Sequence, residues 1–324
     1  MAKVTRSVAT AVELTRVAMA FGAVADLLVI VVLSRSDSQY HYMPVAAMPL
    51  GQAMASATAT AVGLFTFATA LNDLLDARHD RIFSPGRPIA SGRIGTLQAF
   101  SVALASLLLA LVGAISFGPG AIFVAILVAG GSLFYNATAK HIPAFGFLTL
   151  GAIHAGSMLI PNDQFTFTLP ACLAFTHAAA IALAIHLVSS KRPSLSTRAA
   201  WMVAVGSVVA VGTMAWFGMS RSGDAYWPTA SPAWGWVVPL AAIAFAILVI
   251  ARKIRRATSP TIAAEKVARY GALWQALYAA AWLFGCGEPM WGLGALLFAG
   301  VGFGVMTLLK ELVGSSGHAI TFRG

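Results

Sequence analysis

Apolar residues fill stretches of about 20 positions along almost the whole chain, and short polar segments separate them. Each stretch is long enough to cross about 30 Å of hydrocarbon as a helix. The stretches are continuous, whereas the strands of a membrane barrel alternate apolar and polar residues. The pattern predicts spans at residues 13–34, 46–71, 96–117, 119–137, 144–161, 167–188, 198–219, 232–251, 268–287 and 290–310.

We therefore expect a single all-α domain over residues 1–324, a polytopic transmembrane helix bundle of about nine to ten spans. The segment after Ala268 contains either two spans broken at Gly287-Glu288-Pro289 or one span and a surface helix. Two spans return the basic C-terminus to the same side as the other basic loops. Small residues, as in 55–61 and 292–295, predict close packing between helices.

Composition supports a membrane protein. Hydrophobic residues make up 59% of the chain, charged residues only 10%, and the mean hydropathy is +0.81. A soluble domain carries about 25% charged residues, so lipid must be the solvent for most of this chain. Cys172 and Cys286 both lie in apolar stretches, where they are expected as small buried residues without a disulfide framework.

The net charge of +10 could indicate nucleic acid as a partner, but the placement of the basic residues argues against it. With a cytoplasmic N-terminus, all of the 21 Lys and Arg except Arg16, Arg35 and Arg221 fall in cytoplasmic segments. This asymmetry follows the positive-inside rule. We expect membrane lipid and no nucleic acid around this protein, with the N-terminus and the polar loops in the cytoplasm.

The loop Asn72 to Gly92 carries the most distinctive chemistry. If the second span continues past Leu71, then Asp73, Asp76 and Asp80 lie at i, i+3 and i+7 on one helical face. Three adjacent carboxylates repel one another unless a cation compensates them. Mg²⁺ is a hard cation that binds one or two carboxylates together with phosphate oxygens and water, so the spacing predicts a magnesium site.

Arginines in and after the same segment are placed to neutralise phosphate oxygens, because a planar guanidinium can bind them in a bidentate way. They are Arg78, Arg81, Arg87 and Arg93. The Ser84-Pro85 and Arg87-Pro88 pairs should end the helix and begin an irregular loop. The alternative is a membrane-surface loop whose acids pair with its own arginines.

The run Asn72-Asp73-x-x-Asp76-x-x-x-Asp80, followed by Arg87-Pro88 and Ser91-Gly92, resembles the first aspartate-rich motif of the UbiA superfamily of intramembrane prenyltransferases. Arg16 and Tyr135-x-x-x-x-Lys140 extend the resemblance over most of the chain. It implies a UbiA-like fold and Mg²⁺ bound to a polyprenyl diphosphate. The implied metal ligands are Asn72, Asp73, Asp76 and Asp80, while Tyr135 and Lys140 flank the same cavity.

The chain departs from that family after the sixth span, where members usually carry a second aspartate-rich motif. Residues 186–198 contain His186, Lys191 and Arg192 but no carboxylate. Ionising a prenyl diphosphate normally uses two facing cation sites, so we expect one well-held Mg²⁺, with the basic side chains replacing the second. This pattern is similar to an outlying branch of the superfamily in bacterial ebo-type biosynthetic clusters, which implies a bacterial inner (plasma) membrane.

The leading hypothesis is an enzyme that transfers a prenyl group from a polyprenyl diphosphate to an unidentified lipophilic or aromatic acceptor. Its expected catalytic residues are Asp73, Asp76, Tyr135, Lys140 and Lys191. Its expected diphosphate-binding residues are Asn72, Arg78, Arg87, Lys140, His186, Lys191 and Arg192.

Two alternatives remain open. A non-catalytic lipid-binding, scaffold or transport protein would retain one metal and diphosphate site. An ion channel or proton carrier would use Asp26, in the middle of the first span, together with His154 and His177.

Overall fold

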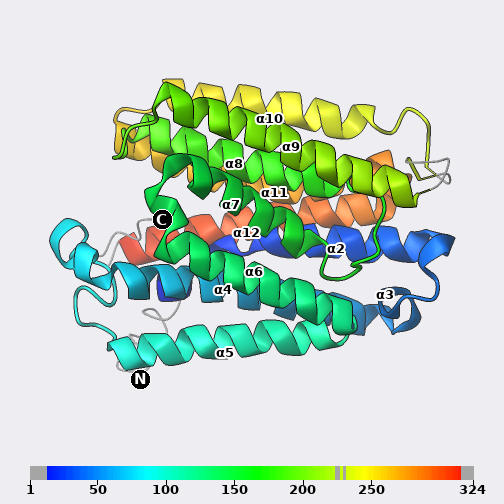
Figure 1. The fold of residues 1–324 in the computed structure, drawn as a ribbon, viewed down its shortest axis with the longest axis horizontal. Helices are drawn as coiled ribbons and strands as arrows, with labels where there is room; N and C mark the ends of the chain where they lie inside the picture. Colours follow the sequence, from blue (N-terminus) through cyan, green and yellow to red (C-terminus); the bar gives the residue numbers. More distant parts are fainter. Residues whose placement is uncertain (1–12, 223–226, 229–230, 315–324) are drawn as a thin grey trace.

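The computed structural model describes residues 13–222, 227–228 and 231–314. Within them, ten long helices run side by side in one bundle (Figure 1). They are α2 (Phe21–Ser36), α4 (Leu50–Phe83), α5 (Thr96–Ile115), α6 (Pro119–Ala137), α7 (Pro143–Met158), α8 (Leu169–Val188), α9 (Thr197–Arg221), α10 (Val237–Arg255), α11 (Pro260–Gly285) and α12 (Pro289–Gly314). The shorter elements are η1 (Val17–Met19), η2 (Ser38–Tyr40), α3 (Pro44–Ala47) and η3 (Ala139–His141).

Each predicted span corresponds to one of the long helices, which confirms the all-helical bundle. Seven of these helices are long and apolar enough to cross a membrane: α4, α5, α6, α8, α9, α10 and residues Pro289–Leu309 of α12. The helices α2 and α7 have 16 residues each, fewer than the roughly 20 of a typical span.

Several helix boundaries differ from the prediction. The first long helix begins at Phe21 rather than at residue 13, because Arg16 adopts a left-handed conformation (φ 47°) and η1 follows it. Helix α4 continues past residue 71 to Phe83, where Ser84-Pro85 ends it as expected. A positive φ of 86° at Gly287 separates α11 from α12, so the C-terminal segment forms two long helices of the bundle.

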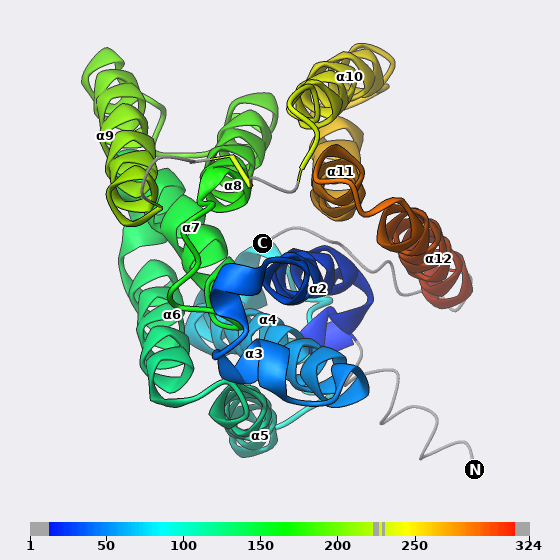
Figure 2. The same ribbon diagram turned by 90° about the vertical axis from the view of Figure 1, so that its right-hand side faces the viewer.

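Small residues allow the helices to pack backbone against backbone, as predicted. A Cβ atom added to Gly63 of α4 would lie 2.5 Å from the Ala110 amide nitrogen of α5. One added to Gly113 of α5 would lie 2.6 Å from the Ser56 carbonyl oxygen of α4. Seen end-on, α2 lies inside the bundle, whereas α5, α9 and α10 lie at its edge (Figure 2). Twelve of the sixteen residues of α2 are buried.

Because consecutive helices alternate in direction, four of the connections meet at one end of the bundle, on the left of Figure 1. They join α4 to α5, α6 to α7 through η3, α8 to α9, and α10 to α11. We call this the motif end, because the aspartate motif closes α4 there. The fold therefore brings segments from four separate parts of the sequence to the same end.

Candidate functional site

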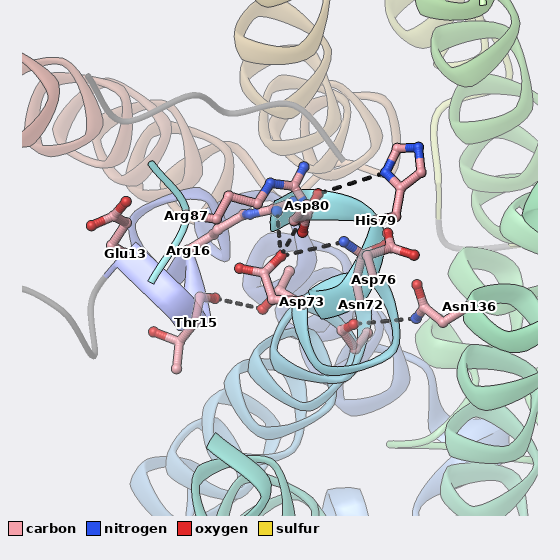
Figure 3. Close-up of polar contacts among 12 residues, drawn as sticks. Glu13, Thr15, Arg16, Asn72, Asp73, Asp76, His79, Asp80, Arg87 and Asn136 are labelled. Carbon is pink, nitrogen blue, oxygen red and sulfur yellow. Dashed lines mark hydrogen bonds and ion pairs between the residues drawn. The ribbon is translucent and has the colours of Figure 1, made fainter. Parts of the chain in front are cut away.

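The last three turns of α4 carry the three aspartates on one side of the helix, as the spacing predicted (Figure 3). The Asp73 and Asp80 side chains are only 3% and 5% exposed, whereas the Asp76 side chain is 23% exposed. Asn72 is also buried, and its Nδ2 donates to Asp73 Oδ1 at 3.3 Å. The motif therefore offers two enclosed carboxylates and one that is more accessible.

Two arginines hold the enclosed carboxylates. Arg16 Nη2 donates to Asp73 Oδ1 at 2.9 Å. Arg87 Nη1 donates to Asp80 Oδ2 at 2.9 Å and to Asp73 Oδ1 at 3.3 Å. Figure 3 shows both guanidinium groups directed at these acids from the segment before α2 and from the loop after α4. This part of the motif matches the alternative in which the acids pair with nearby arginines.

Burial also affects the arginine that precedes α2. Desolvation lowers the pKa of Arg16 below its usual value, and the charge of Asp73 opposes that shift. A buried guanidinium is stable only beside a carboxylate that neutralises it. The Thr69 hydroxyl donates to the Thr15 carbonyl oxygen at 2.7 Å, which fixes the same segment against α4. Arg16 and Asp73 thus depend on each other for their charge balance.

The loop after α4 folds back over the helix. Ile89 is buried in a small apolar cluster with Leu14 of the N-terminal segment and Ala70 of α4. The Ser91 hydroxyl donates to the Arg87 carbonyl oxygen at 2.8 Å. These contacts explain why Arg87 reaches back to carboxylates that lie 7 and 14 residues before it.

The other arginines predicted for this segment lie elsewhere. Arg93 forms an ion pair with Glu13, with contacts of 2.5 and 2.9 Å. Arg78 and Arg81 are exposed on the outer side of α4. Arg78 is therefore not among the described partners of the aspartates, and its predicted contact with a diphosphate stays a prediction.

Lys140 reaches the third carboxylate from η3. Its Nζ donates to Asp76 Oδ1 at 2.6 Å and to Asn72 Oδ1 at 3.2 Å. The backbone around it is well anchored, because Ala139 is fully buried and Asn136 Nδ2 donates to the Ala68 carbonyl oxygen of α4 at 3.2 Å. Tyr135, one turn earlier on α6, is partly buried and lies within electrostatic range of Asp76.

The donor groups of the motif can be compared with those a metal needs. Among the described residues, no three carboxylate, imidazole or thiol groups lie close enough together to hold a metal ion. However, the Lys140 ammonium lies between two hard oxygen atoms, those of Asn72 and Asp76. A divalent cation that also binds phosphate oxygens and water needs only such a pair. Asn72 and Asp76 thus offer oxygen atoms of the kind that Mg²⁺ prefers, and in this structure the Lys140 ammonium contacts both of them.

The basic residues expected to replace a second aspartate motif lie at the same end of the bundle: His186 in the last turn of α8, and Lys191 and Arg192 after it. His186 is buried, and its ring packs edge-on against Phe147 with centroids 5.5 Å apart. The Lys191 backbone amide donates to the His186 carbonyl oxygen at 3.1 Å. The Lys191 and Arg192 side chains are exposed, and neither is a described partner of the three aspartates. The fold thus brings them to the end of the bundle where the aspartate motif lies.

A second polar cluster lies deeper in the bundle, and it includes the residues considered for an ion channel. Gln275 of α11 donates through Nε2 to Asp26 Oδ2 of α2, and the same amide contacts His154 Nδ1 of α7 at 2.9 Å. His177 Nε2 lies 2.9 Å from the Gly271 carbonyl oxygen. The sequence marked Asp26 and the histidines, but Gln275 carried no signal of its own.

This deeper cluster is separate from the motif end. Its described contacts involve Asp26, His154, His177 and Gln275 and include none of the three aspartates of the motif. A cavity of about 10 Å³ adjoins it, lined among others by Asp26, His177 and Gln275, and it has room for about one water molecule. The cluster connects four helices and does not contribute to the aspartate site.

Comparison with known proteins identifies the family and the fold. The model of the UbiA prenyltransferase family matches residues 42–252, about two thirds of the chain. No curated protein matches the chain. A solved structure from work on digeranylgeranylglyceryl phosphate synthase in membranes superposes with a TM-score of 0.55 and 16% sequence identity. The superposition covers 91% of this chain and 99% of that chain, which indicates a shared fold.

Proposed function

Because the chain belongs to the UbiA prenyltransferase family, we propose that it transfers a prenyl group from a polyprenyl diphosphate to a lipophilic or aromatic acceptor. The family and the seven apolar helices identify it as an integral membrane protein. In the proposed reaction, the bond between C1 of the donor and the diphosphate oxygen breaks. The acceptor forms a bond to C1 and gives up a proton, and the diphosphate leaves with the bonding electron pair.

One observation supports the proposal most directly: Lys140 is held between Asn72 and Asp76 at the end of an apolar bundle. This arrangement places hard oxygen ligands and a positive charge side by side, and a diphosphate with Mg²⁺ requires both. Mg²⁺, when bound, would supply Lewis-acid stabilisation of the leaving diphosphate. We propose Asn72 and Asp76 as its main ligands.

The remaining residues of the motif take complementary roles in this proposal. Asp73 and Asp80, also predicted from the sequence as metal ligands, fix the positions of Arg16 and Arg87. Arg87 and Lys140 provide positive charge for the diphosphate, and Tyr135 orients it. The proposal keeps the other residues that the sequence predicts to bind the diphosphate. They are Arg78, His186, Lys191 and Arg192.

The bundle explains why the reaction would take place in the membrane. A prenyl chain gains about 0.8 kcal/mol for each CH₂ group transferred from water into an apolar environment. Its charged head would stay at the motif end, where the basic loops of residues 84–95 and 189–196 lie. By the positive-inside rule, we propose that this end faces the cytoplasm of a bacterium whose inner membrane holds the protein.

A second candidate function is non-catalytic binding of a prenyl lipid, as in a scaffold or transport subunit. Its support is the absence of any carboxylate in residues 186–198, where the family usually has its second motif. The three aspartates are moreover already compensated by three basic side chains, Arg16, Arg87 and Lys140. Such a protein would bind the diphosphate without breaking its bond to the prenyl chain.

An experiment with purified protein in lipid nanodiscs separates these two functions. Labelled farnesyl or geranylgeranyl diphosphate is added with Mg²⁺ and a panel of phenolic and lipid acceptors, and diphosphate release is measured. We expect release that requires both Mg²⁺ and an acceptor. Mg²⁺-dependent binding of the diphosphate without release under every condition would instead establish the non-catalytic function.

A further inference from the structure

The three ion pairs of the motif differ in how easily they can be exchanged. Asp73 and Asp80 are enclosed, and the planar guanidinium groups of Arg16 and Arg87 hold them. The partner of Asp76 is instead the ammonium of Lys140, at the end of a flexible four-carbon side chain. Since an ammonium is a compact charge whose donors rotate freely, the Asp76–Lys140 pair is the easiest of the three to open.

The place of this ammonium has a direct consequence for metal binding. Lys140 Nζ contacts oxygen atoms of both Asn72 and Asp76, at 3.2 and 2.6 Å. A divalent cation bound to the same two oxygens would lie within a few ångströms of Nζ. Two positive charges at that separation repel strongly, even with the screening that is typical near a protein surface. The ammonium and the metal therefore exclude each other.

The structure also indicates how the ammonium would leave. The backbone of η3 is fixed by the buried Ala139, and a Cβ atom at Gly146 would already lie 3.1 Å from the Ala139 carbonyl oxygen. A movement of Lys140 is thus a rotation of its side chain and needs no displacement of the helices. A diphosphate beside the motif would offer several oxygen acceptors and more negative charge than the single carboxylate of Asp76.

We propose that Lys140 is a tethered cation that occupies the metal position until a diphosphate draws its ammonium away, so that metal and diphosphate enter the site together. The inference rests on the proposed function, because it takes the diphosphate as the incoming ligand. It adds an order of binding and assigns the control of that order to one side chain. Without a diphosphate, the metal should bind weakly. A variant that lacks the Lys140 ammonium should bind the metal tightly even without a diphosphate.

The test measures Mn²⁺ retained by the full-length protein in nanodiscs after rapid gel filtration, with empty nanodiscs as background. Mn²⁺ is added alone or with the unreactive analogue farnesyl thiolodiphosphate. For the natural chain, we expect the analogue to tighten Mn²⁺ binding at least about tenfold. For Lys140→Met, we expect Mn²⁺ alone to bind at least about tenfold more tightly than it binds to the natural chain.

Two further variants make the comparison specific. Lys140→Arg keeps a positive charge between the same oxygens, so its binding of Mn²⁺ alone should stay weak. Arg81→Met removes one exposed charge from the outer side of α4, and it should change the affinity for Mn²⁺ by no more than about twofold, because solvent and salt screen that charge. If Lys140→Met does not fold, Lys140→Gln takes its place.

The outcomes separate this inference from the proposed function. If the natural chain binds Mn²⁺ alone as tightly as it does with the analogue, or as tightly as Lys140→Met does, the tethered-cation inference is wrong. If Lys140→Met tightens Mn²⁺ binding but the analogue neither binds nor changes it, then competition is real and the proposed diphosphate substrate is wrong.

Discussion

Arg16 and Asp73 form a buried ion pair across 57 residues of sequence, with Arg16 Nη2 donating to Asp73 Oδ1 at 2.9 Å. The pair joins the segment before the first long helix to the aspartate motif at the end of α4. Arg87 reaches the same oxygen from the loop after α4, at 3.3 Å. One carboxylate oxygen thus holds together three segments that the sequence separates, and this determines where the motif can present its remaining groups.

Removing Arg16 should therefore destabilise the motif end. Arg16→Leu leaves the buried Asp73 carboxylate with Arg87 as its remaining basic partner. We expect the free energy of unfolding to fall by about 2 kcal/mol or more, seen as a lower temperature of thermal unfolding in detergent. Arg16→Lys should recover only part of this loss, because an ammonium lacks the planar fork of a guanidinium.

The matched control is Arg78→Leu, the same change at an exposed position of α4. It should shift the free energy of unfolding by less than about 0.5 kcal/mol. An Arg16→Leu protein as stable as this control would show that the ion pair contributes nothing to the fold.

Substitutions of Asp76 and Asp80 should differ in how they change the Mg²⁺ dependence of diphosphate binding. Asp76→Ala removes the most accessible carboxylate, and we expect the Mg²⁺-dependent affinity for farnesyl diphosphate to fall at least about tenfold. Asp80→Asn mainly deprives Arg87 of a charged partner, so it should lower stability and keep the dependence on Mg²⁺. Diphosphate binding measured with and without Mg²⁺ checks both, and an equal loss of Mg²⁺ dependence in the two variants contradicts this division of roles.

The basic loop after α8 should contribute charge rather than shape to diphosphate binding. Replacing Lys191 and Arg192 together by Ala should weaken binding of farnesyl diphosphate about tenfold, because two charge-assisted contacts are lost. Binding of farnesol, which has no diphosphate, should not change.

Arg255→Ala with Arg256→Ala is the matched control, since both arginines are exposed and lie at the same end of the bundle. An equal loss of affinity in the control would mean that the effect reflects the overall charge of the motif end. Affinity retained in the Lys191 and Arg192 variant would reject their role as a replacement for the second metal.

The deeper cluster around Asp26 should respond to hydrogen bonding more than to charge. Asp26→Asn keeps an oxygen acceptor for Gln275 and carries no charge in the middle of the bundle, so its thermal stability should match or exceed that of the natural chain. Asp26→Leu leaves one Gln275 donor without its acceptor and should be less stable than the Asn variant by about 1 kcal/mol. If the Asn variant is less stable than the natural chain, the cluster needs the ionised carboxylate; if it is less stable than the Leu variant, the hydrogen bond to Gln275 does not stabilise the bundle.

Much of the site was predictable, because it depends on local properties of the chain. The spacing of Asp73, Asp76 and Asp80 predicts one helical face wherever a helix continues through them, and Ser84-Pro85 predicts where that helix ends. Hydropathy over about 20 residues predicts each span by itself. These features need no knowledge of what packs beside them.

The partners of the aspartates could not be predicted in this way. Lys140 lies 64 residues from Asp76, and Arg87 was only one of several arginines with the right charge. The sequence shows Gln275 only as a polar residue in an apolar helix. Its contacts with Asp26 and His154 arise because α2, α7 and α11 pack together. Such contacts depend on how the helices pack, and spacing within one segment carries no information about that.

The sequence by itself determined that this chain is a helical membrane bundle with an acidic motif at the end of one helix, because hydropathy and helical period act over short distances. The tertiary structure decided which basic side chain pairs with each aspartate of the motif. It buried Asp73 and Asp80 against arginines and left Asp76 to a lysine from another helix connection. The physical reason is that buried charges must be compensated at contact distance, and only the packing of distant segments supplies that contact.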